Sequence, residues 1–260
     1  QLAEASGYSL GTVNASVNEL MKNGYIDREM KLTQKAVGLY EANRPEQAVI
    51  LAAGPGMRMI PINTEVSKGM LEVKGEALVE RLIRQLKEVH IDKITLVVGF
   101  MKEQYDYLID EYGVELVYNR EYANKNNLYS LSLVKERLSN AYIMPCDIWC
   151  EKNPFSEEEL YSWYMVNDKL EEESTVRVNR KKELKLTREE EKGNHMVGIA
   201  YVNAETAPKL AERLATCSSH RKYEHSFWED AAMENGKMMF LPKEVSEDDV
   251  VEINTLEELR

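Results

Sequence analysis

The sequence predicts an α/β protein in which a doubly wound sheet lies between helices, preceded by a small helical module. Two observations carry this prediction. From Gln47 onward, short apolar runs typical of buried strands alternate with segments whose apolar residues recur at helical spacing. Before Arg44 the pattern is helical apart from one short extended stretch. The sequence Arg-Pro-Glu at 44–46 interrupts both patterns, so we expect domains over residues 1–44 and 45–260.

The first domain is predicted to contain short helices joined by glycine turns. Apolar residues before Gly7 and a second set over 10–23 predict two helices, and Ser9 is suited to cap the second one. An extended stretch begins at 25–26, and residues 33–40 predict a further helix. This order resembles a winged helix-turn-helix that lacks its first helix, with residues 10–23 in the recognition position.

The predicted recognition helix offers few groups suited to a DNA groove, where Arg, Lys, Asn or Gln usually contact base edges. It carries short polar side chains and one cation: Thr12, Asn14, Ser16, Asn18 and Lys22. A helical module used for packing or dimerisation explains the pattern at least as well as DNA binding does, so both alternatives stay open.

Strands and helices alternate along the second domain as a doubly wound sheet requires. The patterns predict strands over 48–51, 94–98, 114–118 and 141–144, and helices over 77–89 and 102–111. Right-handed crossovers place the loops after these strands along one edge, where α/β sheets bind ligands. The residues that follow the strands at this edge are Gly54, Gly99, Asn119 and Asp147.

The segment AVILAAGPGMR at 48–58 joins the first strand to a glycine loop that ends in an arginine. Glycine allows positive φ and close approach of a ligand, so that successive N–H groups can point at anionic oxygens, and a guanidinium adds donors suited to phosphate. Glycine at a strand end can also be present only because the chain turns there, without any ligand. We expect a nucleotide phosphate site at these residues: Leu51, Ala52, Ala53, Gly54, Gly56, Met57 and Arg58.

Composition describes an ordinary globular protein with an acidic balance. Of 260 residues, 43% are hydrophobic and 30% charged, and the net charge is −12. This charge argues against broad polyanion binding, which needs clustered Lys and Arg, so any anion site is local. The three cysteines show no zinc-site spacing, and no apolar run approaches the ~20 residues that span a bilayer. We expect a cytoplasmic protein with reduced thiols, and we assign no function to the charged segment at 171–192.

The glycine loop resembles the L-A-A-G-x-G-x-R signature of the nucleotidyltransferases of the sugar-nucleotide and cytidylyltransferase superfamily. Their Pro-Lys element corresponds here to Ser67 and Lys68, which keeps the lysine and loses the proline. The resemblance implies a Rossmann-like nucleotide-diphospho-sugar transferase fold with a mixed sheet, and Mg²⁺ held by Asp147 and Asn254. From the residues alone, Asp147 is either such an oxygen ligand or a helix N-cap or turn residue.

Two further segments narrow the resemblance. GFMKEQY at 99–105 and YANKNNLYSLSL at 122–133 are similar to the G-[YF]-x-K-E-Q-[FY] and Y-A-x-x-N-N-x-Y-S-L segments of bacterial CTP:phosphocholine cytidylyltransferases. The similarity extends over residues 47–259. It implies that CTP binds over the glycine loop and that four more residues shape the nucleotide site: Gly99, Asn126, Asn127 and Ser130.

The aromatic pair in HSFWED, at 225–230, is the last segment of interest. Taken alone, such a pair beside acids is typical of the start of an amphipathic helix. The resemblance implies instead a cage in which Phe227, Trp228 and Glu229 hold a trimethylammonium group, because ring faces attract cations and a carboxylate balances the charge. Relatives have Trp-Asp where this chain has Trp228 and Glu229, and the longer carboxylate could shift substrate preference.

Together these features imply Mg²⁺-dependent transfer of CMP from CTP to phosphocholine, with Arg58 and Lys68 as catalytic cations and pyrophosphate as leaving group. Two alternatives stay open. The acceptor could be phosphoethanolamine or 2-aminoethylphosphonate, or the chain could be a DNA-binding regulator whose transferase-like domain senses a ligand. The sequence leaves open the oligomeric state, a homodimer included, and whether the chain is a fragment.

Overall fold

The computed structural model describes residues 2–55, 65–188, 191–246 and 248–253. The chain divides into two compact units. The smaller unit runs as far as Arg44 and includes Glu158–Leu160, and the larger unit holds the rest from Pro45 onward. Within the described residues, no helix combines the length and the apolar character needed to cross a membrane.

Three helices make up most of the smaller unit: α1 (Leu2–Ser6), α2 (Leu10–Lys22) and α3 (Gln34–Ala42). Ser9 caps α2, because its Oγ accepts a hydrogen bond from the N–H of Thr12 at 3.2 Å. An isolated β-bridge between Ile26 and Leu32 closes the extended stretch before α3. The two short helices, the extended stretch and the third helix therefore follow one another in the predicted order.

A seven-stranded mixed sheet forms the centre of the larger unit, in the order β14-β8-β11-β6-β1-β4-β5. Its strands are β1 (Gln47–Ala52), β4 (Lys93–Val98), β5 (Glu115–Tyr118), β6 (Ala141–Pro145), β8 (Trp163–Glu171), β11 (Gly193–Val202) and β14 (Leu241–Val245). Strand β11 runs antiparallel to both of its neighbours, while every other pair in this sheet is parallel. The predicted α/β fold with a mixed sheet is confirmed.

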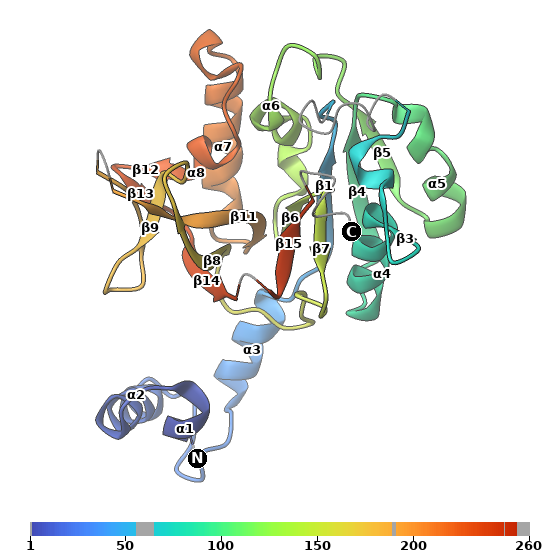
Figure 1. Ribbon diagram of the computed structural model, residues 1–260. Coiled ribbons are helices and arrows are strands. Elements are labelled where there is room, and N and C mark those ends of the chain that lie inside the picture. The colour runs from blue at the N-terminus through green and yellow to red at the C-terminus, as the bar shows by residue number, and fades with distance from the viewer. Residues whose placement is uncertain (1, 56–64, 189–190, 247, 254–260) are drawn as a thin grey trace. The chain divides into compact units, whose positions relative to one another are not determined.

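Helices cover both faces of this sheet (Figure 1). One face carries α4 (Leu78–Glu88) and α5 (Tyr107–Tyr112), and the other carries α6 (Asn127–Ser132) and α7 (Ala207–Ser218). In α4, Leu82, Ile83 and Leu86 recur at helical spacing and are fully buried in the same core cluster as Ile50 of β1. The helix predicted over 102–111 is instead divided into a 3₁₀ turn, η4 (Lys102–Tyr105), and α5.

Smaller elements complete the unit. A second sheet has the order β12-β13-β10-β9, with β9 (Val176–Val178), β10 (Leu184–Leu186), β12 (Met233–Glu234) and β13 (Lys237–Met238). Strands β9 and β10 pair with each other within the charged segment at 171–192. Two further pairs are β2 (Glu72–Val73) with β3 (Glu76–Ala77), and β7 (Ile148–Cys150) with β15 (Val250–Glu252). The short helices are α8 (Glu229–Ala232), η3 (Lys68–Met70), η5 (Lys135–Arg137) and η6 (Arg221–Tyr223).

Candidate active site

The loops after β1 and β4 lie against each other at the carboxyl edge of the sheet. The N–H of Phe100 donates to the carbonyl of Ala53 at 3.1 Å. A Cβ placed on Gly99 would lie 2.7 Å from that carbonyl oxygen and 2.5 Å from the Cβ of Tyr122. Since both distances are shorter than a real Cβ contact allows, the close approach of these loops requires glycine at position 99.

The start of the glycine loop differs from the expectation in one respect. Gly54 does not adopt a positive φ, so the structure does not use the conformational freedom that glycine offers at this residue. No described atom lies within 4 Å of a Cβ built on Gly54. The preceding side chains of Leu51, Ala52 and Ala53 are buried in the sheet, so this segment offers backbone rather than side chains to a ligand. The predicted site residues Gly56, Met57, Arg58 and Asn254 lie outside the described residues.

Lys68 and Asp147 form the central ion pair of the edge. They are far apart in sequence, yet Nζ of Lys68 donates a hydrogen bond to Oδ2 of Asp147. The two side chains are only 12% and 11% exposed. The second oxygen of Asp147, Oδ1, is buried and accepts no hydrogen bond from any described residue. A buried oxygen without a donor is unfavourable, so this atom is suited to binding a further cation or donor.

Close packing brings Lys68 to this position. A Cβ on the next residue, Gly69, would lie 2.9 Å from Oη of Tyr105 and 3.1 Å from Cβ of Cys146, so η3 packs directly on the end of β6. Gln104 holds the chain just before Lys68: its Oε1 accepts from the N–H of Ser67 at 2.8 Å. The sequence did not assign functions to Gln104 and Tyr105, although both belong to the GFMKEQY segment that marked the family resemblance.

The C-terminal strand approaches the same aspartate. Strand β15 pairs with β7 so that Glu252 lies opposite Ile148. In continuation of this pairing, the N–H of Ile253 donates to the carbonyl of Asp147 at 2.8 Å. The chain thus reaches the ion pair at the residue immediately before Asn254.

Asn119 and two asparagines of the YANKNNLYSLSL segment hold neighbouring parts of the site together. The side chain of Asn119, fully buried, donates to Oγ of Ser130 at 2.9 Å, which joins the end of β5 to α6. Asn126 caps α6 and donates from Nδ2 to the carbonyl of His225 at 3.1 Å. Asn127 accepts a hydrogen bond from the N–H of Trp228 at 2.8 Å. The N-terminus of α6 is therefore tied to the HSFWED segment.

Consecutive side chains of that segment point to different environments. Phe227 is 58% exposed, whereas Trp228 is 1% exposed. The ring of Trp228 packs against Tyr164 and Phe240, with centroids 5.7 and 6.0 Å away. The two rings therefore do not present adjacent faces to solvent.

Glu229 follows these two aromatic residues, and its carboxyl group has a buried oxygen and a raised pKa. Oη of Tyr164 donates to its Oε1 at 2.8 Å, while its Oε2 is buried and accepts no hydrogen bond from a described residue. Burial is the main cause that raises the pKa of Glu229 from 4.5 to about 7, and the carboxylates of Asp230 and Glu252 add to the increase. Such a site favours the approach of a cation, which would stabilise the ionised carboxylate.

The comparison with known proteins identifies the family. Residues 48–221 match the MobA-like NTP transferase domain. The choline-phosphate cytidylyltransferase of Streptococcus pneumoniae is 32% identical over 218 residues, which cover 82% of this chain and 95% of that protein. The chain belongs to the MobA-like nucleotidyltransferases. A solved structure of the CTP:phosphocholine cytidylyltransferase from S. pneumoniae superposes on this nucleotidyltransferase with a TM-score of 0.74 and 29% identity, and covers 83% of this chain and 96% of that chain.

A second relative has a different substrate in its name. The 2-aminoethylphosphonate cytidylyltransferase of Lancefieldella rimae is 29% identical over 190 residues, which cover 70% of this nucleotidyltransferase and 77% of that protein.

Residues 1–27 match a winged helix-turn-helix DNA-binding domain. The predicted family and the type of the N-terminal module are thereby confirmed.

Proposed function

We propose that this nucleotidyltransferase transfers CMP from CTP to phosphocholine and releases pyrophosphate. The observation that carries the proposal is the similarity to the S. pneumoniae choline-phosphate cytidylyltransferase along 95% of that protein's length. Two features of this chain agree with it: a shielded lysine–aspartate pair at the carboxyl edge, and a buried carboxyl beside aromatic rings.

Lys68 is the residue we propose for charge neutralisation at the reacting phosphates. Its ammonium is largely shielded from water. In such a shielded position its attraction to an anionic oxygen is stronger than at the protein surface. Gly69 and Gln104 fix the backbone around it, so the ammonium needs little reorganisation when substrates bind. Arg58 and the amides of the glycine loop are proposed to hold the β- and γ-phosphates, and Lys68 the α-phosphate or the incoming phosphate.

The residues at the edge also fit a magnesium ion. Oδ1 of Asp147 is a hard, buried oxygen without a described donor, which is the kind of ligand Mg²⁺ prefers. We propose Asp147 and Asn254 as its protein ligands, since Ile253 is hydrogen-bonded to the carbonyl of Asp147. The metal would supply charge neutralisation on CTP oxygens and on the leaving pyrophosphate. The test is an Asp147→Asn variant, in which we expect a much higher Mg²⁺ requirement and a lower thermal stability, because Lys68 loses its shielded ionic partner, with the fold intact by circular dichroism.

The acceptor's ammonium is proposed to bind at the HSFWED segment. Glu229 would supply the negative charge, and the exposed ring of Phe227 would supply a face for the methyl groups. Trp228 is too deeply packed to form a wall of this site, so we propose that it positions Tyr164, whose hydroxyl donates to Glu229. Asn127 positions the segment through the N–H of Trp228.

In the proposed reaction a phosphocholine oxygen attacks the α-phosphorus of CTP directly and in line. The bond from the α-phosphorus to the bridging oxygen breaks, and pyrophosphate leaves with that electron pair. No covalent intermediate with the protein is needed, because positioning and charge neutralisation supply most of the catalysis in such transfers.

The experiment compares acceptors directly. Pyrophosphate release from CTP and Mg²⁺ is measured with phosphocholine, phosphoethanolamine and 2-aminoethylphosphonate under the same conditions. We expect the highest kcat/KM with phosphocholine, because the exposed ring of Phe227 offers a face to the methyl groups of a quaternary ammonium. A higher kcat/KM with 2-aminoethylphosphonate would instead place the chain with the L. rimae relative.

DNA binding by the smaller unit is a second proposal, favoured by the helix-turn-helix match over residues 1–27. In this proposal α2 contacts the groove with Thr12, Asn14 and Asn18. A salt-dependent gel shift with genomic DNA fragments tests it. Absence of any shift at low salt would leave the unit with a packing function only.

A further inference from the structure

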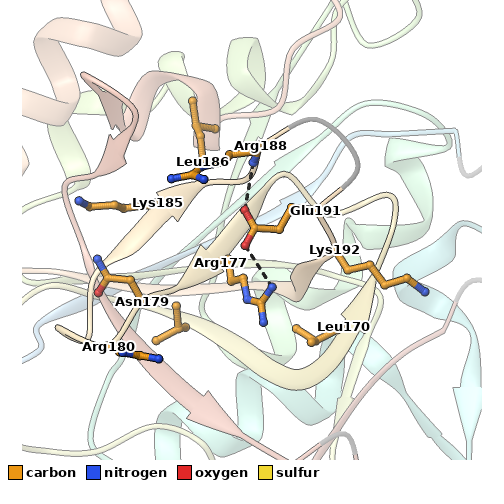
Figure 2. Close-up of a pocket in the computed structure, with 10 residues that line it drawn as sticks. Leu170, Arg177, Asn179, Arg180, Lys185, Leu186, Arg188, Glu191 and Lys192 are labelled. Atoms are coloured by element: carbon orange, nitrogen blue, oxygen red, sulfur yellow. Dashed lines mark hydrogen bonds and ion pairs between the residues drawn. The ribbon is translucent and has the colours of Figure 1, made fainter.

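Cationic side chains gather around a single hollow of this acidic chain. The hollow has a volume of about 980 Å³ and lies on the β9–β10 hairpin and the ends of neighbouring strands (Figure 2). Five of its lining residues are cations: Arg177, Arg180, Lys185, Arg188 and Lys192. Among the described residues, Glu191 is the one acid that lines it. Since the whole chain has a net charge of −12, composition alone does not explain this concentration.

Three of the five cations have acidic partners: Arg177 pairs with Glu191, Lys185 with Glu183 at 3.6 Å, and Lys192 with Glu172 at 3.5 Å. Glu191 lies between Arg177, whose Nη1 is 3.1 Å from its Oε1, and Arg188, whose backbone N–H donates to its Oε2 at 3.2 Å (Figure 2). The guanidinium groups of Arg180 and Arg188 form no ion pair with any described residue. Guanidinium groups bind phosphate through paired hydrogen bonds, so two of them without acidic partners favour an anionic ligand.

The hairpin that carries Arg177, Arg180 and Lys185 is held in a fixed shape. Oδ1 of Asn179 accepts from the N–H groups of Lys181 and Glu183 at 2.9 and 3.0 Å, which closes the turn between β9 and β10. Oδ1 of Asn194 accepts from the N–H of Val178 at 3.0 Å and joins the hairpin to β11. The backbone of these three cations therefore needs little ordering when an anion binds.

Part of the lining is apolar. The side chains of Leu170 and Leu186 line the hollow and are 43% and 49% exposed. An apolar surface next to phosphate donors is suited to a ligand that has a ring as well as phosphates. The hollow is also within the size range of small-molecule sites.

We infer that this hollow is a second anion site, which binds a small molecule with two or more phosphate groups, such as a nucleoside triphosphate or inorganic pyrophosphate. It shares no residue with the candidate active site. A concave group of cations suits a compact oligophosphate better than a DNA duplex, whose regularly spaced phosphates need an extended row of contacts. The inference stands independently of the acceptor substrate.

The test measures binding of ATP and of inorganic pyrophosphate by isothermal titration calorimetry. The full chain is compared with the double variant Arg180→Ala/Arg188→Ala. The matched control is Lys93→Ala/Lys152→Ala, which removes the same charge at two exposed positions outside the hollow. We expect the double variant to weaken one class of sites about tenfold or more, while the control leaves it unchanged. Pyrophosphate release from CTP at the active site should be the same in all three proteins.

Three results would overturn the inference. The first is equal binding of both probes by the double variant and the control. The second is absence of any site beyond the one that CTP occupies. The third is binding of a short DNA duplex that the double variant loses while neither probe binds, which would make the hollow part of a nucleic-acid surface. Thermal unfolding of both variants checks that the hairpin remains folded.

Discussion

Replacement of Glu229 by glutamine should change how stability depends on pH. The amide keeps the shape of the side chain and an oxygen for the hydroxyl of Tyr164, but it cannot ionise. A pKa that rises from 4.5 to about 7 on folding corresponds to about 3.4 kcal/mol against ionisation in the folded state. Because the residue as a whole is only partly buried, although its Oε2 is buried, this value is an upper bound.

The direction in which stability changes with pH follows from where Glu229 holds its proton. Between about pH 4.5 and about pH 7 the folded protein keeps a proton on Glu229 that the unfolded chain has lost. The free energy of unfolding therefore falls as the pH rises through this interval. Glu229→Gln removes this pH dependence. Between about pH 5 and about pH 8, the free energy of unfolding of the variant should therefore rise by up to about 2.5 kcal/mol relative to that of the wild type.

Urea unfolding of both proteins at these two pH values measures the difference. Glu205→Gln, at an exposed position on the surface, is the control and should run parallel to the wild type. Parallel curves for Glu229→Gln as well would refute the burial of this carboxyl. If Glu229 also binds the acceptor's ammonium, the wild-type KM for phosphocholine should fall as the pH rises through about 7, and the variant should lose this dependence.

Three further predictions concern the carboxyl edge. Lys68→Ala should lower kcat by about 10²–10³-fold with the fold intact by circular dichroism, and near-normal turnover would remove this lysine from the mechanism. Gly69→Ala should cost about 1–3 kcal/mol in urea unfolding, because its Cβ would lie 2.9 Å from Oη of Tyr105; unchanged stability would contradict the packing described. Burial raises the pKa of Cys146 to about 12, so its thiol should resist alkylation at about pH 8 in the folded protein and react only after unfolding, and rapid labelling of the native chain would contradict this.

The sheet could be predicted where local pattern decides the structure. The apolar run at 48–51 and the run at 94–98 became β1 and β4, because strands buried on both faces are continuously apolar. The division of 102–111 into η4 and α5 could not be predicted, since it accompanies contacts distant in sequence. Gln104 holds backbone at residues 65 and 67, and Tyr105 is buried against η3.

In the candidate site, too, contacts between residues distant in sequence could be predicted only in part. Lys68 and Asp147 could be brought together from the sequence, because one belongs to a family signature and the other follows a strand that ends at the ligand-binding edge. The pairing of Tyr164 with Glu229 gave no signal, since no local pattern links strand β8 to the HSFWED segment. Sequence neighbours were also a poor guide at Phe227 and Trp228, because adjacent residues at the start of a short helix point in different directions.

Phosphorus NMR of the complete reaction follows the proposed transfer of CMP to phosphocholine. CTP, Mg²⁺ and phosphocholine are incubated with the protein, and the signals of each phosphate are followed in time. We predict that the signals of CTP and phosphocholine disappear together while those of a new diphosphate ester and of pyrophosphate grow in equal amounts. Persistence of the phosphocholine signal while CTP is hydrolysed, or no change in either substrate, would contradict the account.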